Sequence, residues 1–145
     1  AVHTALREAE EETALDPAGV TPLRILDSID ISRTGFAVRP VLAYWHEPHE
    51  LRAVDPAETD AVLPVHLSEL IDPANRLRVG WESWSGPAFR VGDFIVWGFT
   101  AGVLDHLLNA AGWAEEWDDG TVHDLRSTLA ASANKESFAM GGELR

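Results

Sequence analysis

The feature that most constrains the fold of this chain is a run of glutamates close to its amino end. Four of the five residues from 8 to 12 are glutamate, and the residues around them favour a helix. On a helix, Glu8, Glu11 and Glu12 stand at positions i, i+3 and i+4 and therefore share one face. The small and apolar side chains that can pack onto a core fall roughly on the other side: Val2, Ala5, Leu6, Ala9 and Thr13.

This acidic face has two interpretations. Like charges at these spacings repel each other by about 0.2–0.5 kcal/mol per pair, and Arg7 is the only basic neighbour besides His3. Bound Mg²⁺ or Mn²⁺ would turn that cost into a gain, because hard divalent cations prefer carboxylate oxygens. The alternative is a solvated acidic surface that Arg7 partly offsets.

The run resembles the second half of the Nudix box, whose full pattern is G-x5-E-x7-R-E-U-x-E-E-x-G-U with U aliphatic. Arg7-Glu8 matches R-E, Glu11-Glu12 matches E-E, and Leu15 takes the last U position, while Ala14 replaces the glycine. The first half of the box, with its glycine and first glutamate, is absent. We therefore expect a chain that is truncated at its amino end.

In the Nudix family the box forms a loop-helix-loop whose helix glutamates bind the metal ions that hold a diphosphate. The resemblance therefore implies that Glu8, Glu11 and Glu12 hold Mg²⁺ or Mn²⁺. Nudix proteins often add an acidic residue from a loop before a strand, and Glu58 stands in such a position. One of the helix glutamates or Glu58 would take the proton from the attacking water, with Glu8, Glu11 and Glu58 as the catalytic candidates.

Composition excludes several classes of function. The formal net charge of −13 argues against a nucleic-acid-binding surface, because phosphate backbones require clustered lysine and arginine. The chain has no cysteine, so it has no disulfide, thiolate metal site or cysteine nucleophile. No apolar run approaches the ~18 residues of a membrane span. We expect a cytoplasmic protein that acts on a small-molecule nucleotide diphosphate, without nucleic acid or membrane partners, and a homodimer stays open.

The rest of the chain predicts several strands and helices. The expected strands cover residues 23–31, 36–45 and 61–65, followed by a hairpin over residues 86–98 that turns at Gly92. The expected helices cover residues 67–71, 99–112 and 121–133. Thr100 is the expected N-cap and Gly112 the expected C-cap of the second helix. Pro40 predicts an edge position or a bulge in its strand.

This order of elements predicts an α/β (α+β) fold in which a mixed sheet lies between helices. Residues 33–41 and 94–101, and the acidic turn at 55–58, resemble one branch of the Nudix superfamily, the coenzyme A diphosphatases. The resemblance implies a Nudix-type sheet whose amino-terminal strands are missing. Residues 1–118 would form the carboxy-terminal part of the domain, and residues 119–145 a short helix and a flexible tail.

Three other motifs favour structural roles. Pro48 prevents the helix that would align His46 and His49 on one metal ion. Arg76 and Arg78 can meet a substrate phosphate, but a surface role is favoured. Several tryptophans could stack on an adenine ring, but core packing is the commoner role: Trp81, Trp84 and Trp97.

The resemblance implies a metal-dependent hydrolase that cleaves a diphosphate linkage in a nucleotide derivative, such as coenzyme A. This reaction requires neutralisation of the oxygen charge and a water molecule aligned with phosphorus. The alternative is a catalytically inactive Nudix-like binding module or an incomplete fragment.

Overall fold

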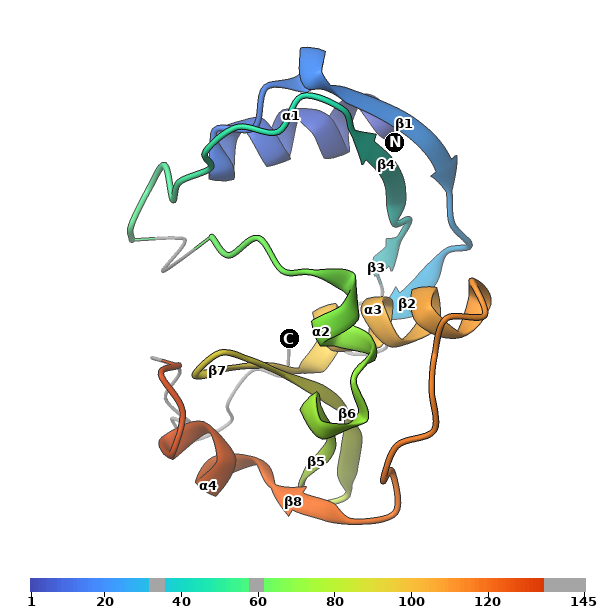
Figure 1. Ribbon diagram of the computed structural model, residues 1–145, viewed down its shortest axis with the longest axis vertical. Helices are drawn as coiled ribbons and strands as arrows, with labels where there is room; N and C mark the ends of the chain where they lie inside the picture. Colours follow the sequence, from blue (N-terminus) through green and yellow to red (C-terminus); the bar gives the residue numbers. More distant parts are fainter. Residues whose placement is uncertain (32–35, 58–61, 135–145) are drawn as a thin grey trace. The chain divides into compact units, whose positions relative to one another are not determined.

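The computed structural model describes residues 1–31, 36–57 and 62–134. The chain forms two compact units, Ala1–Pro64 and Val65–Arg145 (Figure 1). No helix among the described residues is long and apolar enough to cross a membrane.

The first unit begins with the expected acidic helix. Helix α1 spans Val2–Thr13 and ends at Ala14, which adopts the left-handed conformation with φ of 62°. A short 3-10 helix, η1 (Pro17–Gly19), follows, and the carboxylate of Asp16 caps it by accepting a hydrogen bond from the Ala18 N–H. The sequence therefore ends α1 with an Asp-Pro turn, as the pattern predicted.

Four strands follow in the first unit and form two antiparallel pairs. Strand β1 (Val20–Ile25) pairs with β4 (Val41–Trp45), and β2 (Ile29–Ile31) pairs with β3 (Phe36–Val38). Each of the two long strands expected from the sequence is thus divided into two shorter ones. Pro40 lies in the second break, as its missing N–H requires, and the register of β1 with β4 shifts beside Leu23.

The first unit has little apolar burial. Helix α1 has no buried residue. The five side chains that the helical pattern placed on its inner side are only half-buried: Val2, Ala5, Leu6, Ala9 and Thr13. Among the described residues, every buried hydrophobic side chain belongs to the second unit. Leu23 and Tyr44, on the β1–β4 pair, are 61% and 60% exposed.

The second unit is built on a four-stranded sheet in the order β7-β6-β5-β8. Strands β5 (Arg76–Trp81), β6 (Trp84–Val91) and β7 (Phe94–Val96) are antiparallel, and β8 (Val122–Asp124) runs parallel to β5. The expected hairpin is confirmed, and its turn contains Gly92 with φ of 57°, a conformation that favours glycine. The sheet is therefore mixed.

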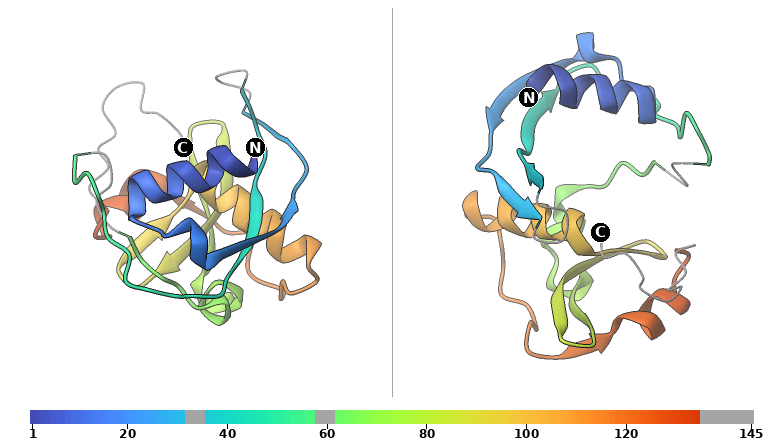
Figure 2. Two further views of the ribbon diagram at one scale, coloured as in Figure 1. Left: turned by 90° about the horizontal axis from the view of Figure 1, so that it is seen from above. Right: turned by 180° about the vertical axis from the view of Figure 1, so that it is seen from behind.

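Helices pack on both faces of this sheet (Figure 2). Alternate side chains of a strand point to opposite faces of the sheet, so Ala88 and Phe89 of β6 belong to two different hydrophobic cores, one on each face. Helices α2 (Leu67–Ile71) and α3 (Gly98–Ala110) share a core with the Phe89 face, through Leu70, Ala101 and Leu108. Helix α4 (Leu125–Ala130) packs with the Ala88 face through Leu125 and Leu129. The expected α+β fold with a mixed sheet between helices is confirmed.

Some expected element boundaries are wrong. Residues 62–65 form no strand, because Pro64 removes a ladder donor; residue 61 lies outside the described residues. The N-cap position of α3 is Trp97 rather than Thr100, and its C-cap is Ala111, with Gly112 following in a left-handed conformation (φ 74°). The helix expected over residues 121–133 begins only at Leu125.

The other short elements complete the second unit. The 3-10 helix η2 (Pro73–Asn75) follows α2, and the carboxylate of Asp72 caps it through the Ala74 N–H. Strands β5 and β8 were not expected from the sequence. The division of the chain at residue 118 remains a prediction.

Candidate functional site

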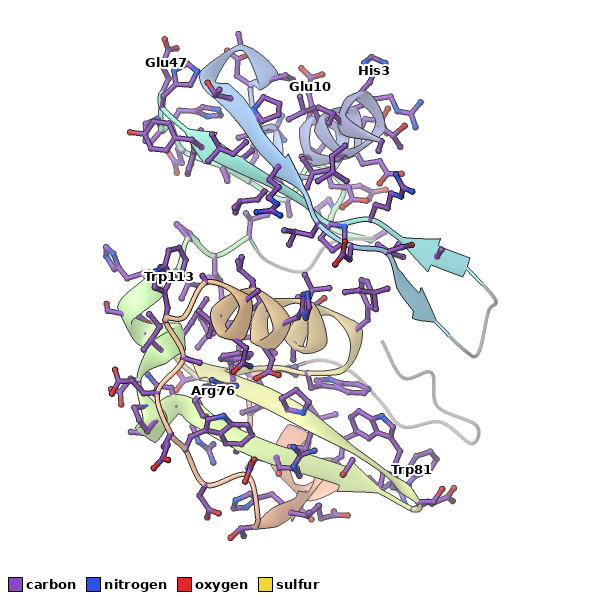
Figure 3. The ribbon with its side chains drawn as sticks, turned by 90° about the vertical axis from the view of Figure 1, so that its right-hand side faces the viewer. His3, Glu10, Glu47, Arg76, Trp81 and Trp113 are labelled. Carbon is purple, nitrogen blue, oxygen red and sulfur yellow. The ribbon has the colours of Figure 1, made fainter. Side chains whose placement is uncertain are left out.

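Helix α1 carries the predicted metal ligands on its solvent-exposed side. Glu8, Glu11 and Glu12 are all exposed, and the helix spacing places them on one face. Figure 3 shows the side chains of this unit, with His3 and Glu10 labelled on α1. Glu10 is exposed as well but stands outside the i, i+3, i+4 set. The structure therefore brings the three candidates onto one helix surface.

Arg7 makes the one ion pair recorded on this helix among the described residues. Its Nε lies 3.8 Å from Oε1 of Glu11, and the two side chains are 54% and 65% exposed. Water screens such a pair, so it contributes little stability. The remaining carboxylates are free to carry another counter-charge.

The donor chemistry of this face fits a hard divalent cation. Carboxylate oxygens are the ligands that Mg²⁺ and Mn²⁺ prefer, and three of them stand within two helical turns. Across residues 1–31, 36–57 and 62–134, no three His, Asp or Glu side chains are grouped closely enough to hold a metal ion. Without a cation, like charges favour separated side chains. The ligand roles of Glu8, Glu11 and Glu12 therefore remain a prediction.

The carboxyl end of α1 is held by a loop from the same unit. The Val54 N–H donates to the Glu12 carbonyl at 3.1 Å, and the Arg52 N–H donates to the Thr13 carbonyl at 3.0 Å. These carbonyls belong to the last turn, where a helix leaves its acceptors without internal partners. The loop therefore fixes the turn that carries Glu11 and Glu12.

Glu58 lies outside the described residues, so its role as a proton acceptor remains a prediction. His46 and His49 have other contacts: both ring nitrogens of His49 take part in hydrogen bonds, and the ring of His46 lies beside that of Tyr44.

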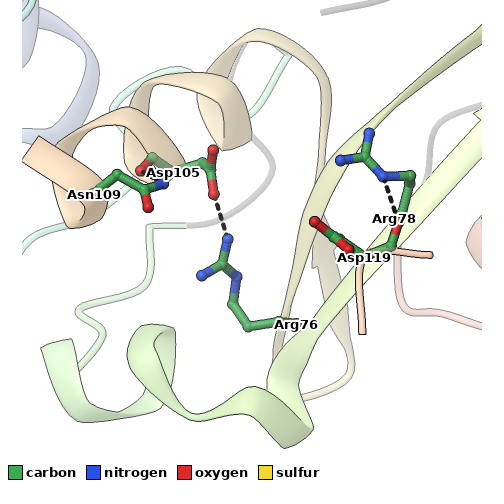
Figure 4. A network of polar contacts seen from close by, with 5 residues as sticks. All are labelled: Arg76, Arg78, Asp105, Asn109 and Asp119. Carbon is green, nitrogen blue, oxygen red and sulfur yellow. Dashed lines mark hydrogen bonds and ion pairs between the residues drawn. The ribbon is translucent and has the colours of Figure 1, made fainter. Parts of the chain in front are cut away.

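Arg76 has a different environment from the surface role that the sequence favoured. Its side chain has no exposed area, and Nη2 forms an ion pair with Asp105 of α3 (Figure 4). The guanidinium carbon lies 4.5 Å from the ring centres of both Phe89 and Trp117. The surface interpretation of Arg76 is therefore wrong, because two aromatic rings and a carboxylate replace its hydration.

Arg78 and the tryptophans have structural contacts. The Nε of Arg78 donates to the Asp119 carbonyl at 2.8 Å (Figure 4). Trp97 is buried in the core on the Ala88 face, and Trp81 and Trp84 pack against that core. The prediction that these tryptophans fill a core is confirmed.

The second unit has a polar pocket that sequence reasoning did not find. Its volume is about 390 Å³, and the β6–β7 turn and α4 line it, with Arg90, Asp93, Ser127, Thr128 and Ser132 among the lining residues. The hydroxyls of Ser127 and Thr128 already donate to Asp124, and that of Ser132 donates to the Leu129 carbonyl. Arg90 and Asp93 are therefore its free charged groups among the described residues.

Sequence comparison identifies relatives of the chain. It is 33% identical over 117 residues to "Uncharacterized Nudix hydrolase NudL" of Escherichia coli K12, an alignment that covers 74% of this chain and 57% of that protein. It is 32% identical over 111 residues to "Nudix hydrolase 15, mitochondrial" of Arabidopsis thaliana, covering 70% of this chain and 38% of the relative. NudL of Shigella boydii is 33% identical over 116 residues, covering 73% and 56%.

These relatives are longer than the chain, which spans little more than half the length of the NudL proteins. No family model matches the sequence. No solved structure matches it either. Over the aligned lengths the chain is similar to proteins named Nudix hydrolase.

Proposed function

We propose that this chain carries the metal-binding helix of a Nudix-type hydrolase that cleaves a diphosphate linkage in a nucleotide derivative. The observation that carries the proposal is the exposed face of Glu8, Glu11 and Glu12, on a helix whose last turn is anchored by the loop at Arg52 and Val54. The similarity to Nudix hydrolases supports the same activity.

In this proposal Glu8, Glu11 and Glu12 hold Mg²⁺ or Mn²⁺. A bound divalent cation neutralises negative charge on a diphosphate and so favours attack at phosphorus. Glu8, Glu11 or Glu58 accepts the proton of the attacking water. Arg7, paired with Glu11, orients the carboxylates and does not contact the substrate.

The proposed substrate is coenzyme A or a related compound. This part rests on the resemblance of residues 33–41 and 94–101 to the coenzyme A diphosphatases. Cleavage would give a phosphopantetheine and a 3′-phosphorylated adenosine nucleotide. A cytoplasmic location and a homodimeric assembly are also predictions.

The test is Mn²⁺-dependent release of nucleotide from coenzyme A. We expect Glu11→Gln and Glu12→Gln, made in the intact protein, each to lower kcat on the order of 100-fold with a smaller change in KM, because charge stabilisation matters most in the transition state. The double variant should lose far less than the product of the two effects if both residues serve one metal cluster.

Glu10→Gln is the matched control, because Glu10 belongs to the same run but not to the proposed ligand set. Near-normal turnover in either Glu11→Gln or Glu12→Gln would remove that residue from the site. Mn²⁺ binding without any cleavage would favour a catalytically inactive binding module.

A further inference from the structure

The imidazole of His49 links two segments at the carboxyl end of α1. Its Nε2 accepts a hydrogen bond from the Asp16 N–H at 3.0 Å, and its Nδ1 lies 3.0 Å from the Glu50 carbonyl oxygen. Because Nε2 is the acceptor, Nδ1 carries the proton and donates it to Glu50. The two bonds together specify one neutral tautomer and one ring orientation.

Packing restrains the same ring. The rings of His49 and Trp45, the last residue of β4, form a T-shaped pair with a centroid distance of 5.7 Å and an interplanar angle of 81°. Edge-to-face pairs of this kind are a favoured aromatic arrangement. His49 therefore connects β4, the turn after α1 and the beginning of the loop that reaches Val54.

This connection matters for the last turn of α1. Helix ends fray, and Glu11 and Glu12 stand within three residues of the end of α1 at Thr13. The loop restrains that turn through the Arg52 and Val54 N–H groups, one of which donates to the carbonyl of Glu12 itself. His49 fixes the loop just before these two donors.

We propose that His49 is a positioning residue for the glutamate face of α1. It holds the loop of residues 50–54 against the end of the helix, and the loop in turn holds the peptide groups of Glu12 and Thr13. The inference rests on the proposed metal-binding role of that face. Ligands held in place before the cation arrives lose less conformational entropy on binding it.

Three substitutions separate hydrogen bonding from simple loss of a side chain. In His49→Gln the side-chain carbonyl oxygen can take the position of Nε2 and accept from the Asp16 N–H. In His49→Asn the shorter amide reaches only the position of Nδ1, and His49→Ala retains neither bond. The matched control is His46→Gln. The ring of His46 lies tilted beside that of Tyr44, and the hydrogen bond from His46 to the Gly19 carbonyl is donated by the backbone N–H, which the substitution retains.

Two measurements on the full 145-residue chain test the proposal. Amide hydrogen exchange without metal reports whether the Asp16, Arg52 and Val54 N–H groups stay protected. Electron paramagnetic resonance of free Mn²⁺ reports its dissociation constant. We expect His49→Ala and His49→Asn to speed exchange at these amides and to weaken Mn²⁺ binding roughly 10-fold, whereas His49→Gln and His46→Gln stay close to the unsubstituted chain.

The outcomes distinguish this inference from the proposed function. Unchanged Mn²⁺ affinity in His49→Ala, with normal binding by the unsubstituted chain, would overturn the role of His49 and leave the metal site in place. Equal loss in His49→Gln and His49→Ala would overturn the role of the hydrogen bond to Asp16. No Mn²⁺ binding by the unsubstituted chain would overturn both proposals.

Discussion

Arg76 of β5 and Asp105 of α3 form an ion pair inside the second unit, with Nη2 of the arginine 2.5 Å from Oδ1 of the aspartate. The arginine side chain has no exposed area, whereas the aspartate side chain is 30% exposed. Two further nitrogens of Arg76, Nε and Nη1, are buried without a hydrogen-bond partner among the described residues. The carboxylate of Asp105 is therefore the group that balances the positive charge of the buried Arg76 guanidinium.

We expect Asp105→Asn to destabilise the chain by about 3 kcal/mol, the lower end of the range for breaking a buried pair, because Asp105 keeps partial contact with water. The substitution leaves the guanidinium charge buried without its carboxylate. Urea unfolding followed by tryptophan fluorescence measures the change in the free energy of unfolding.

Asp93→Asn is the control for this experiment, since Asp93 is an exposed aspartate in the β6–β7 turn of the same unit. Its effect should stay within about 0.5 kcal/mol. A cost for Asp105→Asn as small as that of the control would show that the rings of Phe89 and Trp117 suffice to hold Arg76.

Much of the second unit follows from local sequence patterns, but Arg76 shows where such patterns fail. Leu77, Val79 and Trp81 alternate with polar residues or glycine, which is typical of a strand, although β5 was not among the expected elements. Arg76 and Arg78 instead suggested a surface segment, whereas Arg76 is buried beside Asp105, which lies 29 residues away in the sequence. No local pattern predicts that pairing.

Other differences have similar causes. β8 has three residues and forms only because it lies parallel to β5. By contrast, α1 and the β6–β7 hairpin were predictable, because helical spacing and a Gly-containing turn are local signals. The glutamate face was also predictable from spacing alone, whereas the hydrogen bond between Asp16 and His49 joins residues 33 positions apart and carries no sequence signal.

A second prediction concerns Asp124, the N-cap of α4. Its carboxylate accepts hydrogen bonds from the backbone N–H and the hydroxyl of Ser127, which hold the pKa of Asp124 below its ordinary value, with a smaller contribution from Arg126. A lowered folded-state pKa means that the stabilisation is complete above the unfolded pKa of about 3.9. It is lost as the pH falls through the lower folded-state pKa.

We therefore expect Asp124→Ala to lower Tm at pH 7 and to have a smaller effect at pH 2. Asp124→Asn is the matched variant, because asparagine caps a helix without titrating. Its loss of Tm at pH 7 should be smaller than that of Asp124→Ala. Thermal melts of all three chains at both pH values check this, and a pH-independent difference between Asp124→Ala and the unsubstituted chain would contradict it.

A third prediction concerns the exposed apolar side chains of the first unit. Leu23 on β1 is 61% exposed, beside the register shift with β4. Exposed apolar strands with free edges favour association. We expect the 15.9 kDa chain to self-associate, and Leu23→Lys to shift it towards the monomer in sedimentation velocity.

Leu63→Lys is the control for charge, since Leu63 is also exposed (47%) but stands outside any strand. It should change association less than Leu23→Lys does. A monomeric unsubstituted chain at micromolar concentration would contradict the prediction. If Leu23→Lys and Leu63→Lys reduced association equally, the cause would be the change in net charge and not the exposed strand.

The most direct test of the glutamate site is a thermal melt of the chain with increasing Mn²⁺. A ligand that binds only the native state raises Tm, and at a hundredfold excess over Kd we expect a rise of ~5–10 °C. Glu8→Gln should reduce this rise, and the triple substitution of Glu8, Glu11 and Glu12 by glutamine should abolish it, while Glu10→Gln retains it. A Tm that stays unchanged up to millimolar Mn²⁺ would contradict the account and identify this face as a solvated helix surface.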